Sequence, residues 1–183
     1  MTNWIRRGML VALAALIVAV VPAVAATRKA PGRASVTAVH RPDLKPNRDL
    51  GQADDLRWLR STTRIKSGGA LTLRNLTRGQ TPGTPNEIHN FSIVTSRQIP
   101  RTQLQALDCR VCKAINERHN FDDTTGKPRI AVVNRGSKGI DRPGDSVAFS
   151  GTRKARVTAK PGRTLHFICA IHPHMQGKLE VGR

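Results

Sequence analysis

From about Ala53 onward, the apolar residues of the chain are distributed as in short β-strands. Leu71 and Leu73 alternate with Thr72 and Arg74, as residues on the two faces of a strand do. Turn-forming glycine and proline pairs separate this run from those that follow. Many short strands at close spacing predict an antiparallel β-sandwich. The further strands predicted from the same pattern are Ile88–Val94, Arg129–Asn134, Ser146–Phe149, Arg156–Ala159, Thr164–Cys169 and Gly177–Val181.

One segment has the periodicity of a helix instead. Apolar residues recur there every three or four positions, which places them in one stripe along a helix. This stripe consists of Leu104, Leu107, Val111 and Ile115. It predicts a helix over Thr102–Arg118, within an insertion at about residues 100–125 that covers an edge or an end of the sandwich. The expected fold class is therefore all-β, a sandwich with a helical insertion.

The first 26 residues have the layout of a secretory signal peptide. Arg6 and Arg7 precede the unbroken apolar run Met9–Val21, and Ala23–Ala25 supply small residues for a signal peptidase. A membrane anchor is the alternative, but a spanning helix needs about 20 apolar residues. We therefore expect an exported protein, periplasmic or extracellular, which is associated with the membrane if the leader is retained.

Residues 27–52 are expected to form a basic, proline-rich linker ahead of a domain at 53–183. The chain has 31 Lys and Arg against 12 Asp and Glu, a net charge of +19. Such a charge often indicates nucleic-acid binding, but export and an aromatic content of 3% disfavour it. An acidic partner protein, an anionic membrane surface or a cell-surface polymer fits better. We expect a monomer.

The C-terminal segment concentrates side chains that bind metal ions. Cys169, His172 and Met175 follow one another at intervals of three residues, where a predicted strand runs into a tight loop. Cu(I) favours sulfur and Cu(II) favours imidazole, so a set of two His, one Cys and a distant Met serves both oxidation states. The segment therefore predicts most of a copper site.

The remaining ligand is expected from another strand, and His89 is the candidate. Along Ile88–Val94, His89 shares a face with Phe91 and Ile93, which directs it towards the core. A core histidine without a metal is the common alternative for a lone residue. Cys169 also shares an inward face with apolar residues, so the two side chains are expected to meet in a buried site near one end of the sandwich.

The His89-Asn90-Phe91 triplet, together with the C-terminal Cys-x-x-His-x-x-Met motif, resembles the copper signature of the cupredoxins, the family of plastocyanin and azurin. The ligand loop is closest to the amicyanin spacing. The resemblance covers about Ser61–Gly182. It implies a Greek-key β-sandwich that holds one type 1, or blue, copper ion.

The resemblance also implies a role for each residue of the motif. Asn90 would donate its backbone N–H to the cysteine sulfur, and an exposed edge of the loop histidine would be the electron port. The implied copper ligands are His89, Cys169 and His172 in the equatorial plane and Met175 as the weak axial ligand.

Two functional classes follow from these motifs. The first is an electron carrier with one copper ion and a redox protein as partner, and the second is a protein for copper delivery, storage or tolerance. Enzymes are not expected. A binuclear copper-A centre needs two Cys in the ligand loop, and a multicopper oxidase needs several His-x-His pairs, of which this chain has His172-Pro173-His174 alone.

A second cysteine cluster lies in the predicted helix. Cys109 and Cys112 would form a local disulfide in an oxidising compartment. Alternatively, the two thiols and His119 fall within about 80° of arc on a continuous helix and would form a second metal site. Haem attachment would need His directly after Cys112, where Lys113 stands. A second metal site would favour the copper-handling function.

Overall fold

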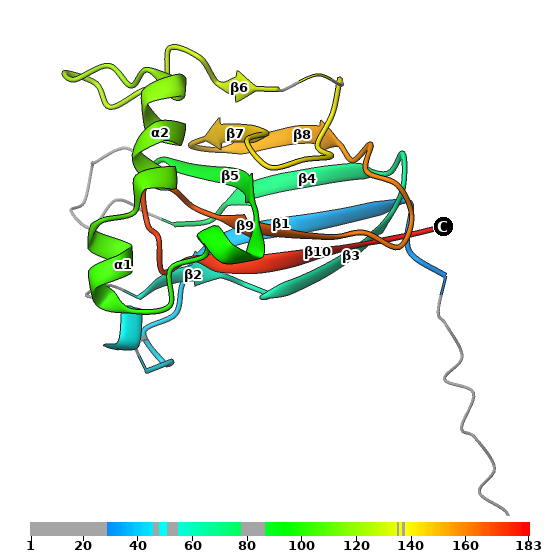
Figure 1. Cartoon of the computed structure of the whole chain (residues 1–183), viewed down its shortest axis with the longest axis horizontal. Helices are drawn as coiled ribbons and strands as arrows, with labels where there is room; N and C mark the ends of the chain where they lie inside the picture. The colour runs from blue at the N-terminus through cyan, green and yellow to red at the C-terminus, as the bar shows by residue number, and fades with distance from the viewer. Residues whose placement is uncertain (1–28, 46–47, 51–54, 78–86, 135, 137) are drawn as a thin grey trace, which may run out of the picture.

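The computed structural model describes residues 29–45, 48–50, 55–77, 87–134, 136 and 138–183, and the predicted signal peptide lies outside them. Two sheets face each other in this part of the chain (Figure 1). The four-stranded sheet has the order β2-β1-β4-β8, with β1 (Arg33–His40), β2 (Leu56–Trp58), β4 (Ala70–Asn75) and β8 (Thr152–Arg156). The six-stranded sheet has the order β3-β10-β9-β5-β7-β6, with β3 (Thr62–Lys66), β5 (His89–Val94), β6 (Val132–Val133), β7 (Ser146–Phe149), β9 (Thr164–Ile168) and β10 (Gln176–Gly182).

The all-β sandwich with a helical insertion is thus confirmed, but the sheets are not purely antiparallel. β1 runs parallel to β4, and β10 runs parallel to β3, whereas the other strand pairs are antiparallel. The predicted strand Arg156–Ala159 is displaced. β8 ends at Arg156, and Val157 lies buried beyond it, paired with Ile140 through a single bridge. Because β8 is an exposed edge strand, it lacks the apolar alternation that the prediction used.

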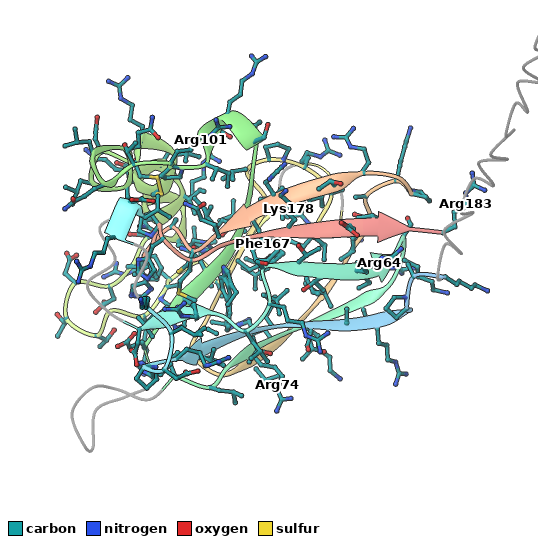
Figure 2. The ribbon with its side chains drawn as sticks, turned by 90° about the horizontal axis from the view of Figure 1, so that it is seen from below. Arg64, Arg74, Arg101, Phe167, Lys178 and Arg183 are labelled. Carbon is teal, nitrogen blue, oxygen red and sulfur yellow. A yellow bond between two sulfur atoms is a disulfide. The ribbon has the colours of Figure 1, made fainter. Side chains whose placement is uncertain are left out.

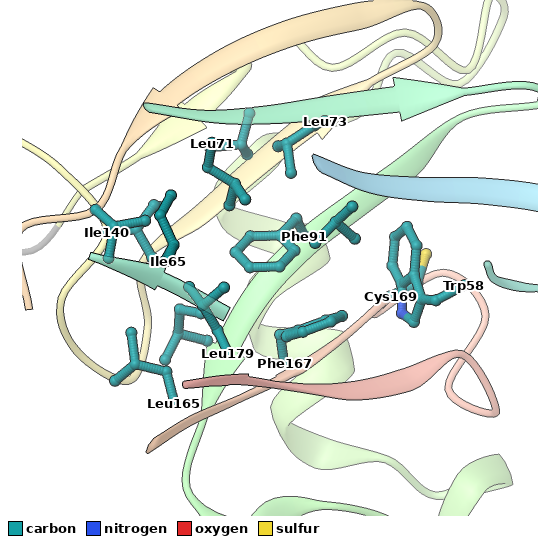
Figure 3. Packing of buried hydrophobic residues seen from close by; sticks show 14 of the residues in the cluster. Trp58, Ile65, Leu71, Leu73, Phe91, Ile140, Leu165, Phe167, Cys169 and Leu179 are labelled. Atoms are coloured by element: carbon teal, nitrogen blue, oxygen red, sulfur yellow. The ribbon is translucent and has the colours of Figure 1, made fainter. Parts of the chain in front are cut away.

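The core lies between the two sheets (Figure 3). It is built by the side chains that the strands of both sheets direct inward. The rings of Phe91 and Phe167 lie 4.5 Å apart between their centroids, and Trp58 meets Phe167 edge-on at 5.8 Å. Gly177 pairs with Phe167 across β9 and β10, and a Cβ atom at Gly177 would lie 2.3 Å from the phenyl ring. The absence of a side chain at Gly177 therefore leaves the room that the Phe167 ring occupies.

The prediction of a linker over 27–52 is wrong for Arg33–His40. This segment is β1, which pairs with β4 from Arg33 to Ala38 and with β2 from Ala38 to His40. Val36 and Ala38 are buried in the core. The period-two pattern of these small residues is weak beside the prolines and positive charges that surround it. The prediction of a linker followed the composition of the segment and missed this strand pattern. The domain therefore includes residues well before 53.

The predicted helix Thr102–Arg118 is two helices, α1 (Gln103–Leu107) and α2 (Arg110–His119). The break falls where Asp108 ends α1 and Cys109 caps the start of α2. Consequently Leu104 and Leu107 are 78% and 77% exposed, although the stripe pattern predicted that they are buried. The 3-10 helices are η1 (Arg48–Leu50) and η2 (Ser96–Gln98).

Both α-helices stand at one end of the two sheets, as the prediction of an insertion over an end required (Figure 1). α2 packs there through Ile115 and Cys112, which form a small buried cluster with Val94, Ile168 and Ala170. None of the helices in the described ranges is long and apolar enough to cross a membrane.

Candidate metal centre

His89, Cys169 and His172 come together at the end of the sandwich near α2. One ligand atom from each residue lies within 4.8 Å of the other two. The Nδ1 atoms of His89 and His172 lie 3.8 Å and 3.6 Å from the sulfur of Cys169. An ion bound about 2.0–2.3 Å from each of two donors holds them roughly 3.5–3.8 Å apart. The spacing of the three donors therefore fits one shared ion.

β5 delivers His89 into the core with a fixed ring orientation. The side chain is fully buried, and its ring lies 6.2 Å from both Trp58 and Phe149 between centroids. The Thr77 hydroxyl donates to Asn75 at 2.6 Å, so its oxygen accepts from His89 Nε2 at 3.2 Å. This hydrogen bond selects the tautomer that leaves the lone pair of Nδ1 directed at the sulfur.

The surroundings of His89 also favour its neutral, ligating form. Burial lowers the pKa of His89 to about 3, and the nearby His172 contributes to the same shift. An imidazole must be deprotonated at the nitrogen that binds a metal ion. At neutral pH, His89 therefore needs to lose no proton before it binds.

Cys169 follows β9 directly and is fully buried. Its backbone N–H donates to the Met175 carbonyl at 2.9 Å, while His172 N–H donates to the Cys169 carbonyl at 3.1 Å. The expected bond from Asn90 is confirmed, since its backbone N–H lies 3.4 Å from the Cys169 sulfur. A donor on the sulfur stabilises a thiolate, the form of cysteine that binds metals.

Met175 closes the ligand loop. Its N–H donates to the His172 carbonyl at 2.8 Å, and its own carbonyl accepts from the indole of Trp58 at 3.0 Å. The side chain is buried in the same core cluster as Cys169. The loop is thus held both within itself and against β2, while axial ligation by Met175 stays a prediction.

His172 is the donor nearest to solvent. Its side chain is 20% exposed, and its Nε2 lies 4.0 Å from a carboxylate oxygen of the half-buried Glu87. His174 stands beside it, with ring centroids 6.1 Å apart, and its Nε2 donates to the Leu56 carbonyl at 3.2 Å. The predicted electron port is therefore a narrow edge flanked by a carboxylate and a second imidazole.

A network of amide side chains fastens α2 to the residues beside the donors. Asn90 Nδ2 donates to Asn116 Oδ1 at 3.0 Å, and Asn116 Nδ2 donates to the Ala170 carbonyl at 3.1 Å. Asn90 Oδ1 accepts from Ala170 N–H and from the Ser92 hydroxyl. Asn90 and Ala170 are the chain neighbours of His89 and Cys169, so the helix supports the centre from outside.

Among the alternatives for the second cysteine cluster, the structure contains the disulfide between Cys109 and Cys112. The alternative of a second metal site with His119 is wrong. Both sulfurs are bonded to each other, and Cys109 caps α2 instead of lying on its face. His119 is fully buried, where its Nδ1 donates to the Ile130 carbonyl at 2.6 Å and its Nε2 lies 2.7 Å from the Ser146 hydroxyl. Burial lowers its pKa.

Three residues that support the metal centre are not predicted by the sequence pattern. Thr77 orients His89, Asn116 ties α2 to the ligand loop, and Trp58 binds the carbonyl of Met175. Trp58 belongs to a short alternating segment with Leu56, which was a detectable sign of a strand. Thr77 and Asn116 act through contacts with residues distant in sequence, and no local pattern indicates them.

No protein-family model matches the chain, and no curated protein matches it. Among solved structures, it is similar to a dithionite-reduced auracyanin from Roseiflexus castenholzii, with 14% identity, a TM-score of 0.44, and coverage of 84% of this chain and 99% of that one. It is also similar to auracyanin A, a blue copper protein from Chloroflexus aurantiacus, with 16% identity, a TM-score of 0.39, and coverage of 83% and 99%.

A third similar structure is an azurin from Methylomonas sp. strain J, with 13% identity, a TM-score of 0.40, and coverage of 82% of this chain and 98% of that one. The predicted resemblance to cupredoxins agrees with these names. The identities and TM-scores are low, so the assignment of the metal centre stands on its own geometry: two imidazoles and a thiol that meet at the end of a β-sandwich.

Proposed function

We propose that the protein is a copper-binding electron carrier with one type 1 copper ion, held by His89, Cys169 and His172 with Met175 as axial ligand. The observation that carries this proposal is the convergence of three donors from β5 and the loop after β9 within 4.8 Å of one another. Two imidazoles, a thiolate and a thioether are the donors that suit both oxidation states of copper. When bound, copper supplies a one-electron couple.

The chain's own contribution is to keep these donors still. Thr77 holds the His89 ring, Asn90 holds the Cys169 sulfur, and Trp58 holds the end of the loop. Phe91 and Phe167 pack in the same core and keep water away from the donors. Donors that do not move between two oxidation states keep the reorganisation small, which is what fast electron transfer requires. A protein partner would reach the centre through the exposed edge of His172.

The disulfide favours a carrier over a copper-handling protein. The copper-handling alternative depended on a second site at Cys109 and Cys112, and both sulfurs are engaged in the disulfide. A disulfide also fits an oxidising compartment, which supports export by the predicted leader at residues 1–26. The high positive charge supports a redox partner with an acidic surface, because opposite charges steer association.

The test is a visible and electron-paramagnetic spectrum of the copper-loaded protein, with copper counted on the same sample. We expect one copper ion per chain and an intense thiolate-to-copper band. Cys169→Ser should abolish the band, because it removes the thiolate and leaves the disulfide untouched. A band that keeps its full intensity in Cys169→Ser, or a count of two tightly held ions, would contradict the proposal.

A further inference from the structure

A groove runs along the helical insertion, outside the metal centre. It has a volume of about 1240 Å³ and lies between the segment from Thr95 to Arg101, the two α-helices, and the turn at Pro143 and Gly144. The insertion forms one wall through α1 and another through α2. The groove is therefore a property of the insertion, and the sandwich alone would not have it.

The lining combines positive charge with apolar surface. It contains four arginines and one carboxylate, which are Arg97, Arg101, Arg110, Arg118 and Asp108. Its apolar residues include Ile99, Pro100, Leu104, Val111, Ala114 and Ile115. Within the described part of the chain, none of the four arginines takes part in an ion pair. Leu104 is 78% exposed on α1, so its apolar side chain is open to contact from a molecule in the groove.

We propose that this groove docks an acidic segment of the redox partner, with leucine-like side chains between its carboxylates. This inference rests on the proposed electron-transfer function. Arginines at the rim would pair with the carboxylates, while Leu104 and Val111 would contact the apolar residues of the segment. Interfaces commonly combine an apolar centre with a charged rim that speeds association.

The positive charge of the groove favours an acidic partner segment over the other possible occupants. Residues 1–28 of the chain contain no aspartate or glutamate, so this segment would carry positive charge into a positive groove. A second copy of the chain would present the same arginines and would be repelled. Nucleic acid is disfavoured because the described lining contains no aromatic side chain on which bases would stack.

The position of the groove relative to the centre suits a redox partner. Its wall residue Ile115 belongs to the cluster that includes Ile168 and Ala170, on either side of Cys169 in the chain, and Val111 packs against that cluster. The same helix hydrogen-bonds Ala170 and Asn90 through Asn116. A partner seated on α2 would therefore be separated from the donors by that helix.

The probe is a fluorescein-labelled peptide built from glutamate and leucine, with a copy in which glutamine replaces each glutamate. Binding to the full chain is measured by fluorescence anisotropy at low and high salt. We expect Arg97→Glu with Arg101→Glu to weaken binding about tenfold or more, and the glutamine copy to bind far more weakly. Leu104→Ala should also weaken binding, without any change in charge.

The matched control is Arg74→Glu with Arg153→Glu, on exposed positions of β4 and β8 in the other sheet. Figure 2 shows Arg101 beside the helices and Arg74 on the opposite side of the molecule. This pair changes the net charge equally and should alter binding less than about threefold. Equal weakening by both pairs would overturn the proposal, because attraction would then be general. The proposal would also be overturned if the protein bound anionic vesicles through Arg97 and Arg101 but did not bind the peptide.

The groove variants should keep the visible copper band of the parent protein, since none of them touches a donor. Loss of peptide binding with an intact band would therefore show that the substitutions affect the groove alone. Absence of the band in the parent protein, with peptide binding retained, would contradict the proposed metal centre and leave the proposed groove unaffected. The two proposals fail separately in this design.

Discussion

At the scale of single residues, the ligand set was predictable and its supports were not. The spacing of Cys169, His172 and Met175, and the alternation that turns His89 inward, are local patterns that survive in a single sequence. Thr77 is different, because it meets His89 across 12 positions and through a side-chain hydrogen bond. Such contacts depend on how strands pack, which no local pattern encodes.

Replacing Thr77 should weaken copper binding without unfolding the protein. Thr77→Val keeps the shape but removes the oxygen that accepts from His89 Nε2. Loss of the partner of a metal-ligating histidine typically costs about 10–100-fold in metal affinity. Copper affinity is measured by competition with a chelator.

Thr63→Val is the matched control for this substitution. Thr63 is also buried, but its hydroxyl makes no hydrogen bond with another described residue, and it lies on β3. The control should keep the affinity of the parent protein. If the two variants bind copper equally well, Thr77 does not orient His89.

Among the helices and strands, those strands whose apolar and polar residues alternate regularly were predicted from the sequence. Elements whose sequence pattern and composition disagree were not. Ser146–Phe149 was located correctly, whereas β1 was hidden among prolines and arginines. The insertion was recognised as helical, but the break between α1 and α2 was missed. Helical spacing continues across the break by chance, so Leu104 and Leu107 gave a false signal of burial.

Removal of the disulfide should affect stability and leave the copper centre unchanged. Cys109→Ser with Cys112→Ser opens a short loop at the start of α2. In the loop-entropy model such a short loop contributes about 2 kcal/mol to the free energy of unfolding. Urea unfolding measures this loss, and the visible spectrum of the copper-loaded variant should match that of the parent. If the double variant lost the visible band, or if the parent protein bound a second copper ion that the variant did not bind, these sulfurs would be shown to handle metal.

At the scale of the whole molecule, one end of the sandwich carries the chemistry and the rest provides a rigid frame. Both sheets supply parts of that end, since Trp58 comes from β2 and His89 from β5. α2 closes it from outside through Asn116. The buried histidines make the stability of this assembly depend on pH in a definite direction.

The copper-free protein should lose stability as the pH falls below about 6.5, the pKa of histidine in an unfolded chain. The unfolded chain takes up protons there, while His89, with a pKa of about 3, stays neutral in the fold. The loss continues until the folded pKa is reached, and His119 adds to it in the same direction. From pH 7 to pH 5, His89 alone should account for about 2 kcal/mol.

Urea unfolding of the copper-free protein at several pH values measures this slope. His89→Gln should flatten it, because the replaced side chain does not titrate. A parent protein as stable at pH 5 as at pH 7 would contradict the assignment of His89 as a buried neutral imidazole.

The proposed function requires that side chains from β5 and the loop after β9 share one copper ion. The most direct test is a crystal structure of the copper-loaded protein with anomalous scattering recorded at the copper edge. We expect a single strong peak within about 2.0–2.3 Å of His89 Nδ1, Cys169 Sγ and His172 Nδ1. A peak at any other place, such as beside His174 and away from the Cys169 sulfur, would show that these side chains do not share the ion.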